Sequence, residues 1–222
     1  MLTEAIIFST KVLRSPLWCL FVDKQAAFDM VMKQHILPAA LSAAGGPGHA
    51  DKSLVYLANR LSNRRTFFEF DSVLMGPILD SVGAEQGGIL SSDEFQLVNS
   101  EELKVTNDSL LGLDMGGVHV ASIGAADDVV LVSPSPHGLQ GLLNLSSHFC
   151  IQKSLINVQG KTRLVVFEPS NFSPSIPYNC SELVMDGKPL SFSSEAGWLN
   201  KDPIKALIRK QLVLFQPRFL PY

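Results

Sequence analysis

The stretch from Val118 to Ser133, VHVASIGAADDVVLVS, decides how the rest of the chain is interpreted. Two runs rich in β-branched residues, Val118–Ile123 and Val129–Val132, flank a break of small and acidic residues, and this pattern predicts a β-hairpin. The break ends in two adjacent carboxylates, Asp127 and Asp128. Neighbouring negative charges at the edge of an apolar sheet repel each other and resist desolvation, and a divalent cation would relieve both costs. A solvated turn is the alternative, because aspartate is common in turns.

Length and composition place the chain among globular proteins. A hydrophobic content of 46% with 18% charged residues is typical of a chain that buries a core, and 222 residues suffice for one domain or slightly more. The net charge of −3 lacks the basic excess that usually marks nucleic-acid-binding proteins. The sequence shows no membrane span, signal peptide or C-x-x-C spacing, so we expect an intracellular protein of the nucleus or cytoplasm.

Apolar spacing predicts an alternation of strands and helices. Trp18–Val22 is a continuous apolar run and predicts a buried strand. The other strands are expected over Thr66–Phe70, Ser154–Val158 and Leu164–Phe167. The helices are expected over Leu2–Leu13, Gln25–Ala44 with its first part kinked or ended by Pro38, Lys52–Leu61, Asp93–Leu103 capped by Ser92, and from Ser135-Pro136 through His148. This order predicts an α+β fold in which helices back a mostly antiparallel sheet.

The amino-acid composition changes beyond Pro169. Residues 171–179 are rich in Pro and Ser and predict a linker. Leu183–Met185 and Pro189–Phe192 flank an Asp-Gly turn and predict a small hairpin. A short amphipathic helix is expected over Lys201–Leu214.

A third carboxylate, Asp23, ends the buried strand and precedes a helix. A charge there is costly unless it is paired or coordinated, although aspartate also caps helices well. If Trp18–Val22 lies beside the hairpin, Asp23 meets Asp127 and Asp128 at one edge of the sheet. Three carboxylates at one edge suit two Mg²⁺ ions ~3.5–4 Å apart, a pair that favours in-line displacement at phosphorus.

Four segments occur in an order that resembles a known family. They are FVDKQAAFD (21–29), GAEQGGILSS (83–92), ADD (126–128) and GKTRLVVF (160–167). These segments are similar to palm motifs A to D of reverse transcriptases, in particular those of non-LTR retrotransposons. The resemblance covers roughly residues 18–167 and, faintly, residues 183–196. It implies a polymerase palm-like sheet and RNA-directed DNA polymerase activity, with an RNA template, a DNA primer and deoxynucleoside triphosphates as partners.

The resemblance also implies roles for individual residues. Asp23 and Asp127 would ligate two Mg²⁺ ions, or Mn²⁺ in their place, with Asp128 as a less direct partner. The backbone carbonyl of Lys24 would add a ligand. Phe28 matches the aromatic residue that lies under the sugar and excludes a 2′-hydroxyl, a role compatible with packing in the core.

Three further positions match the family motifs. Gln86 and Gly87 match residues that line the nucleotide and template pocket, where glycine allows close backbone approach; a plain turn is the alternative. Lys161 matches a lysine proposed as proton donor to, or electrostatic partner of, the pyrophosphate leaving group, and a solvated turn lysine is the alternative. Arg64 and Arg65 precede an aromatic strand, where they would contact a backbone phosphate or lie in a solvated turn.

Some positions depart from the family pattern. Ala125 stands where Phe or Tyr is usual, Ser91-Ser92-Asp93 replaces Ser-Pro, and Ala84-Glu85 replaces an apolar-Pro or apolar-Arg pair. We expect the fingers and thumb to be largely missing. The expected domains are residues 1–17 as a remnant of the fingers–palm junction, 18–168 as the palm, and 169–222 as a linker with a small hairpin and a degenerate tail.

Two hypotheses about function follow from the sequence. The first is a fragment of a reverse transcriptase palm that transfers nucleotides to a primer 3′-hydroxyl by two-metal chemistry. The second is a catalytically inactive retroelement remnant or palm-like binding module. A palm-fold nucleotide cyclase is a third idea, but its glycine-rich signature has no match in this sequence.

Overall fold

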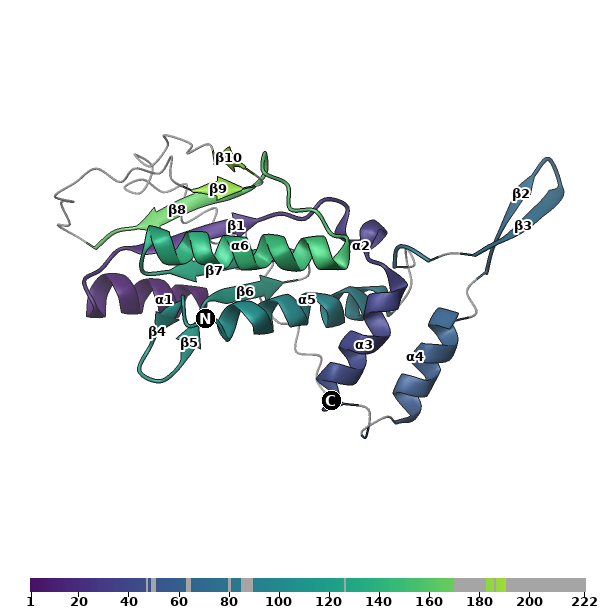
Figure 1. The fold of residues 1–222 in the computed structure, drawn as a ribbon, viewed down its shortest axis with the longest axis horizontal. Helices are drawn as coiled ribbons and strands as arrows, with labels where there is room; N and C mark the ends of the chain where they lie inside the picture. Colours follow the sequence, from purple (N-terminus) through teal and green to yellow (C-terminus); the bar gives the residue numbers. More distant parts are fainter. Residues whose placement is uncertain are drawn as a thin grey trace.

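The computed structural model describes residues 1–46, 48, 51–62, 65–79, 81–84, 90–125, 127–169, 183–185 and 187–190. Its centre is a four-stranded antiparallel sheet in the order β6-β7-β1-β8. Helices lie against this sheet, while a helix and a two-stranded hairpin project from one end of the body (Figure 1). The fold is therefore α+β with helices backing an antiparallel sheet, as the sequence predicts.

The bounds of the elements follow the chain. The helices are α1 (Leu2–Ile7) with its π-helical continuation η1 (Phe8–Val12), α2 (Ala27–Met30), α3 (Lys33–Ala43), α4 (Lys52–Ser62), α5 (Ser91–Asn107) and α6 (Pro136–Lys153). The strands are β1 (Leu17–Val22), β2 (Arg65–Phe70), β3 (Val73–Leu79), β4 (Leu113–Asp114), β5 (His119–Val120), β6 (Ser122–Ala125), β7 (Asp128–Ser133), β8 (Arg163–Phe167), β9 (Val184–Met185) and β10 (Lys188–Pro189).

Strand β1 lies at the centre of the sheet, between β7 and β8. It pairs with β7 from Trp18 opposite Ser133 to Val22 opposite Val129. Every residue of β1 except Phe21 is buried. The apolar run that the sequence shows here does form a buried strand, because both faces of this strand are covered.

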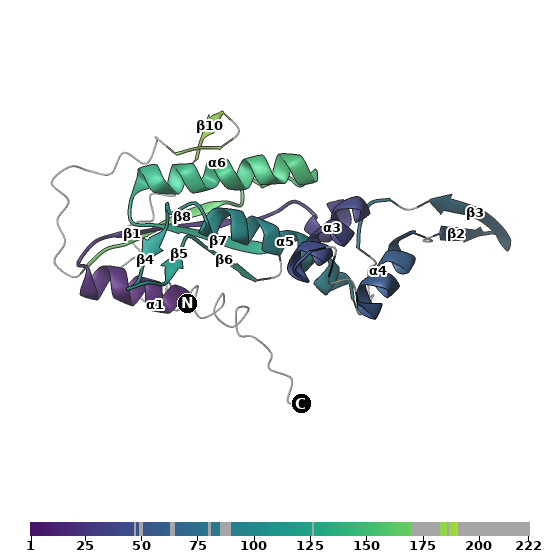
Figure 2. The ribbon, with the colours of Figure 1, turned by 60° about the horizontal axis from the view of Figure 1, so that its bottom comes forward.

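Alternate residues of β1 contribute to two apolar cores on opposite faces of the sheet. Trp18, Leu20 and Val22 pack in one core with leucines of α6. Leu17 and Cys19 pack in the other core with residues of α1. Figure 2 shows α6 and α1 on the two sides of the sheet. Burial raises the pKa of the Cys19 thiol, which keeps this cysteine protonated and unreactive.

The helix expected over Gln25–Ala44 is interrupted earlier than predicted. It consists of α2 and α3, separated at Val31 and Met32, and Pro38 lies inside α3. The interruption arises because Met32 bridges Val82 and the carbonyl of Val31 accepts a hydrogen bond from the N–H of Gly83. Backbone groups that pair with another segment are lost to the helix. The prediction that the first part of the helix ends at Pro38 is wrong, because α3 continues through it; a kink there stays a prediction.

Helix α5 begins one residue before the predicted cap. Its N-cap is Leu90, which has no capping side chain, and Ser91 is the first helical residue. The prediction that Ser92 caps this helix is therefore wrong. By contrast, α6 begins at Pro136 as predicted, and the Ser135 hydroxyl caps it by accepting a hydrogen bond from the N–H of Gly138.

The hairpin around the two aspartates has a shorter first strand than predicted. Strand β6 pairs with β7, whereas His119 and Val120 belong to β5, which pairs with β4. The run is broken because the side chain of Asn107 accepts hydrogen bonds from the N–H groups of Ala121 and Ser122. The strand predicted over Ser154–Val158 is also wrong, since only Asn157 in it forms a bridge, to Lys24.

The C-terminal part is described only in its small hairpin. Strands β9 and β10 pair around the predicted turn, and Leu183, Met185 and Leu190 join the core beneath α6. The predicted linker over residues 171–179 and the predicted helix over Lys201–Leu214 lie outside the described residues. In the part that is described, no helix is long and apolar enough to cross a membrane.

The central position of β7 gives a test of this core. Leu131 is fully buried against β1 and α6, so we expect Leu131→Ala to lower the free energy of unfolding by about 2–5 kcal/mol. Ile151, which is 72% exposed on α6, is the control, and Ile151→Ala should change this free energy by less than about 1 kcal/mol. Urea unfolding followed by circular dichroism measures both, and equal losses would contradict the packing.

Candidate active site

The pairing of β1 with β7 places the predicted acidic residues at one end of the sheet. Val22, the last residue of β1, lies opposite Val129. Asp23 follows Val22, Asp128 precedes Val129, and the antiparallel register makes them neighbours across the two strands. Asp127 precedes Asp128 in the turn of the β6–β7 hairpin. The backbone register therefore places these three residues at the same end of the sheet, where we expected them.

The charges at this edge repel one another. The pKa of Asp128 is raised first by burial, then by the negative charges of Asp127 and Asp23, while Lys24 acts in the opposite direction. A raised carboxyl pKa means that ionisation is less favourable here than in water. Asp127 and Asp23 therefore both disfavour ionisation of Asp128. Such mutual repulsion among carboxylates is common where acidic residues share a cation or take part in catalysis.

Lys161 reaches this edge from a turn before β8. The N–H of Val158 donates to the carbonyl of Asp23, and the N–H groups of Lys161 and Thr162 donate to the carbonyl of Val158. The resulting turn brings Lys161 Nζ to 3.2 Å from Asp23 Oδ2. The lysine side chain is 67% exposed and the aspartate side chain 29% exposed, so this ion pair is open to water and weak.

The donor set at the edge suits a hard cation. Asp23, Asp127 and Asp128 offer carboxylate oxygens, the ligands that Mg²⁺ and Mn²⁺ prefer, and a cation would offset the repulsion that raises the pKa of Asp128. As their side chains lie, however, the described residues contain no group of three His, Cys, Asp or Glu close enough to hold a metal ion. Asp23 is instead paired with Lys161. The chemistry of the residues fits a divalent cation, which would replace the lysine as the partner of Asp23.

Phe28 lies on α2, one turn beyond Asp23. Its ring is partly buried, and its centroid lies 5.0 Å from that of Phe95 on α5. The carbonyl of Phe28 accepts a hydrogen bond from the N–H of Ala84. In the described residues, Phe28 therefore packs in the core and its backbone binds Ala84.

Of the other residues predicted to contact substrate or nucleic acid, the structure describes only Arg65. Gln86, Gly87 and Arg64 lie outside the described residues. Arg65 is the first residue of β2 and is exposed, and Figure 1 shows β2 projecting away from the sheet.

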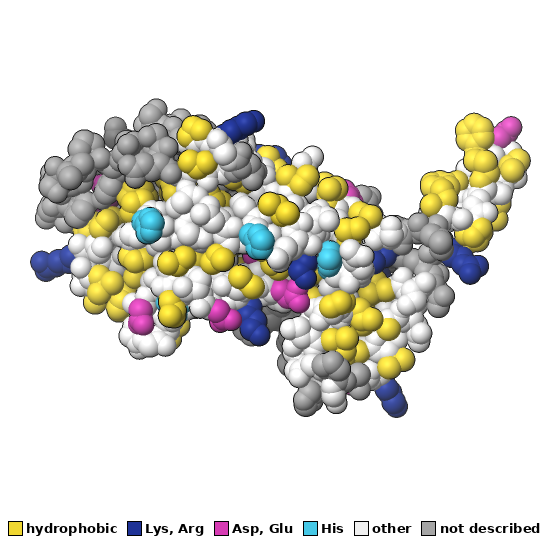
Figure 3. Space-filling view, viewed as in Figure 1, with side chains coloured by type: hydrophobic (Ala, Val, Ile, Leu, Met, Phe, Trp, Pro, Cys, Tyr) yellow, Lys and Arg dark blue, Asp and Glu magenta, His cyan; other side chains and the backbone are white. Residues whose placement is uncertain are grey.

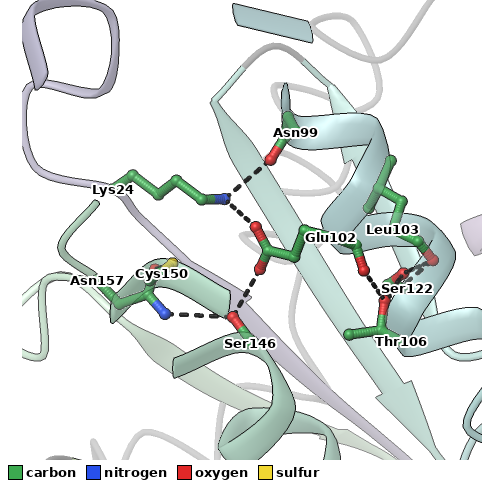
Figure 4. Close-up of polar contacts among 9 residues, drawn as sticks. All are labelled: Lys24, Asn99, Glu102, Leu103, Thr106, Ser122, Ser146, Cys150 and Asn157. Carbon is green, nitrogen blue, oxygen red and sulfur yellow. Dashed lines mark hydrogen bonds and ion pairs between the residues drawn. The ribbon is translucent and has the colours of Figure 1, made fainter. Parts of the chain in front are cut away.

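A buried polar network behind the edge was not predicted from the sequence. Lys24 Nζ lies 3.0 Å from Glu102 Oε2, with both side chains fully buried, and donates a hydrogen bond to Asn99 Oδ1 at 3.1 Å. The hydroxyl of Ser146 donates to Glu102 Oε1 at 2.6 Å. Figure 4 shows these contacts between the segment after β1, helix α5 and helix α6.

The network continues to Asn157, in the segment that lies beside Lys24. The Asn157 side chain donates to the hydroxyl of Ser146 and accepts a hydrogen bond from Cys150 (Figure 4). Asn157 also bridges Lys24 through the backbone, and the next residue, Val158, binds the carbonyl of Asp23. The backbone of Asp23 is therefore held in place twice: by the bridge from Asn157 to Lys24, the next residue, and by the hydrogen bond from Val158.

One signal in the sequence could have revealed this network. The buried positions of α5 recur every three or four residues and include Asn99, Glu102 and Thr106 as well as apolar residues. Polar residues at inward positions of a helix require partners in the core. Lys24, beside a buried strand, is the matching cation.

Comparisons with known proteins give a distant similarity in structure. The chain matches no protein-family model and no curated protein. The fold is similar to a solved structure of apo telomerase from Candida tropicalis truncated from its C-terminal domain, with 12% sequence identity and a TM-score of 0.45. The similarity covers 77% of this chain and 35% of that one, so the chain spans about a third of the length of that structure.

The buried pair of Lys24 and Glu102 gives a prediction about stability. Glu102→Gln leaves the Lys24 charge uncompensated in the core and should lower the free energy of unfolding by about 3–5 kcal/mol. The double variant Lys24→Met/Glu102→Gln should recover at least half of this loss, because no unpaired charge remains. Glu101→Gln is the control, since Glu101 pairs with Lys153 at a partly exposed position and should cost about 1 kcal/mol at most. Equal effects of the two single changes, measured by urea unfolding, would contradict the network.

The raised pKa of Asp128 gives a prediction about pH. The folded protein disfavours the ionised form of Asp128, so ionised Asp128 destabilises the fold. This destabilisation is absent at a pH below the pKa of Asp128 in the unfolded chain, and complete at a pH above its pKa in the folded chain. Asp128→Asn should therefore raise the melting temperature at neutral pH by about 1–3 °C, and the gain should vanish below about pH 4. The exposed Glu168 is the control, and Glu168→Gln should leave the melting temperature unchanged. A stabilisation by Asp128→Asn that persists at low pH would show that charge repulsion is not its cause.

Proposed function

We propose that the chain is a polymerase palm of the reverse transcriptase type that transfers nucleotides to a primer 3′-hydroxyl. The observation that carries this proposal is the meeting of Asp23, Asp127 and Asp128 at one edge of the antiparallel sheet. Carboxylates from separate segments at such an edge can bind the cations that phosphoryl transfer requires. The ordered sequence motifs that resemble reverse transcriptases support the same assignment.

The residues at the edge have distinct roles in this reaction. Asp23 and Asp127 would hold Mg²⁺ or Mn²⁺, with Asp128 beside them. The bound cation would polarise the α-phosphate of the nucleotide and favour the ionised form of the primer 3′-hydroxyl. Pairing of β1 with β7 and the hydrogen bond from Val158 hold the backbone of Asp23 in place, so little rearrangement is needed when substrate arrives.

Lys161 would act on the leaving group. The 3′-oxygen forms a bond to the α-phosphorus while the bond from that phosphorus to the pyrophosphate oxygen breaks, and the leaving oxygen gains negative charge. Lys161 Nζ is exposed and pairs with Asp23 in this structure; once a cation takes its place on Asp23, the lysine would be free to donate a proton to that oxygen. Phe28 would contact the sugar of the nucleotide and select against a 2′-hydroxyl.

The substrates follow from the sequence motifs. We infer a deoxynucleoside triphosphate, a DNA primer and an RNA template, with a non-LTR retrotransposon as the source of the coding sequence. The described structure carries the acidic edge and the helices that support it.

An inactive remnant or palm-like binding module is the second candidate. The observation that favours it is the ion pair between Lys161 and Asp23, which occupies a proposed metal ligand. The net charge of −3 also favours it, because binding to nucleic acid depends on basic side chains that neutralise phosphates.

A primer-extension assay tests the polymerase function. The purified chain should extend a DNA primer on an RNA template with Mg²⁺ or Mn²⁺, and Asp127→Asn should lower the rate at least about 100-fold because a metal ligand is lost. Asp108, an exposed acid at the C-terminal end of α5, is the control, and Asp108→Asn should leave the rate unchanged. Absence of extension with either metal would contradict an active polymerase in this chain and favour the second candidate.

Calorimetric titration with Mn²⁺ separates the two candidates even without activity. A cation site at the edge should lose most of its affinity on Asp23→Ala, whereas a surface acid such as Asp108 should have no effect when changed to Ala. Binding that is equally weak in all three proteins would support the inactive remnant.

A further inference from the structure

The hairpin of β2 and β3 is an apolar ribbon without a partner in the described part of the chain. The two strands form a two-stranded sheet of their own. Seven of its apolar side chains are each at least 50% exposed: Phe67, Phe68, Phe70, Val73, Leu74, Met75 and Ile78. Figure 3 shows hydrophobic side chains gathered over this projecting segment. An isolated two-stranded ribbon is at best marginally stable in water, so a partner would stabilise it.

The two edges of the ribbon differ in their ability to accept another strand. Strand β3 contains Pro77, and the register shifts where Gly76 and Pro77 lie opposite Phe67. A proline and a bulge are both features that block pairing at a strand edge. Strand β2 contains neither, so its outer edge is the one open to a further strand.

The turn determines which backbone groups this open edge presents. Asp71 and Ser72 both have positive φ, and Phe70 lies opposite Val73, so they form a two-residue hairpin loop. In such a hairpin the residues that flank the loop exchange hydrogen bonds, and the pattern alternates along the strand. Phe70 and Phe68 therefore bind β3. Beyond the register shift, Thr66 lies opposite Ile78 and its carbonyl oxygen faces Gly76 of β3, so the N–H and C=O groups of Glu69, Phe67 and Arg65 face outward.

These outward residues are complementary to a second copy of themselves. If two β2 strands pair antiparallel about Phe67, Phe67 lies opposite its own copy and Arg65 lies opposite Glu69 of the other chain, twice per dimer. All three are residues that present outward hydrogen-bonding groups, as such a pairing requires. Their side chains alternate with those of Phe68 and Phe70, so they share one face of the ribbon.

We propose that the outer edge of β2 pairs with β2 of a second copy of this chain, forming a four-stranded sheet in a symmetric dimer. The opposite charges of Arg65 and Glu69 set the register, and the backbone groups of the three outward residues provide the hydrogen bonds. The contact is short, so its dissociation constant is on the order of 10 μM.

Sedimentation velocity of the full 222-residue chain, from about 1 to about 200 μM to bracket this affinity, tests the dimer. Arg65→Glu places like charges opposite each other at two sites and should weaken association about tenfold or more, as should Glu69→Arg. The double variant Arg65→Glu/Glu69→Arg restores both opposite-charge pairs and should return the dissociation constant to within about threefold of the original. Glu168→Lys, which changes an exposed acid outside the ribbon, is the matched control and should have no effect.

Several results would overturn the proposal. The chain could remain monomeric over the whole concentration range, which would mean that something other than a second copy covers the ribbon. Association could be unaffected by both single charge reversals, which would indicate contact through the apolar faces rather than the β2 edge. Failure of the double variant to restore association would exclude the register about Phe67. Circular dichroism of each variant confirms that these exposed changes leave the fold intact.

Discussion

The antiparallel register between β1 and β7 is the constraint on which the rest of the structure depends. It runs from Trp18 opposite Ser133 to Val22 opposite Val129. A slip of one residue would turn Trp18, and the residues of β1 that point the same way, to the opposite face of the sheet and away from α6. The same slip would separate Asp23 from Asp128. The packing that stabilises the sheet therefore also fixes the relative positions of the acids at its edge.

The charges around this edge are arranged in two layers. Asp23, which follows β1, is partly exposed and contacts Lys161, whereas the adjacent Lys24 is buried and paired with Glu102. Lys24 also lowers the pKa of Asp128, which burial and the negative charges of Asp127 and Asp23 raise. A buried cation behind an acidic edge offsets part of the repulsion without occupying the edge itself. The exposed Lys161 can exchange its partner at little cost, which leaves Asp23 available to a ligand.

Much of the sheet and part of the site were predictable from the sequence. The apolar run before Asp23, the Ser135 cap of α6 and the Asp127-Asp128 hairpin all have strong local signals. Predictions failed where tertiary contacts decide local structure. Met32 pairs with Val82, which separates α2 from α3. The Asn107 side chain accepts hydrogen bonds from two N–H groups before β6, which shortens the first strand of the hairpin. The network of Lys24 and Glu102 joins residues far apart in sequence, and local patterns show only that each is an unusual polar residue in an apolar setting.

We propose that Asp23, Asp127 and Asp128 form one site for a divalent cation. Paramagnetic broadening of backbone amide resonances by Mn²⁺ tests it most directly, because the effect depends on distance from the bound ion. We expect substoichiometric Mn²⁺ to broaden the amides at the end of β1 and at the start of β7 before any others, and Mg²⁺ to compete for the site. Broadening that begins at other acidic residues, or that is spread evenly over the surface, would contradict the claim.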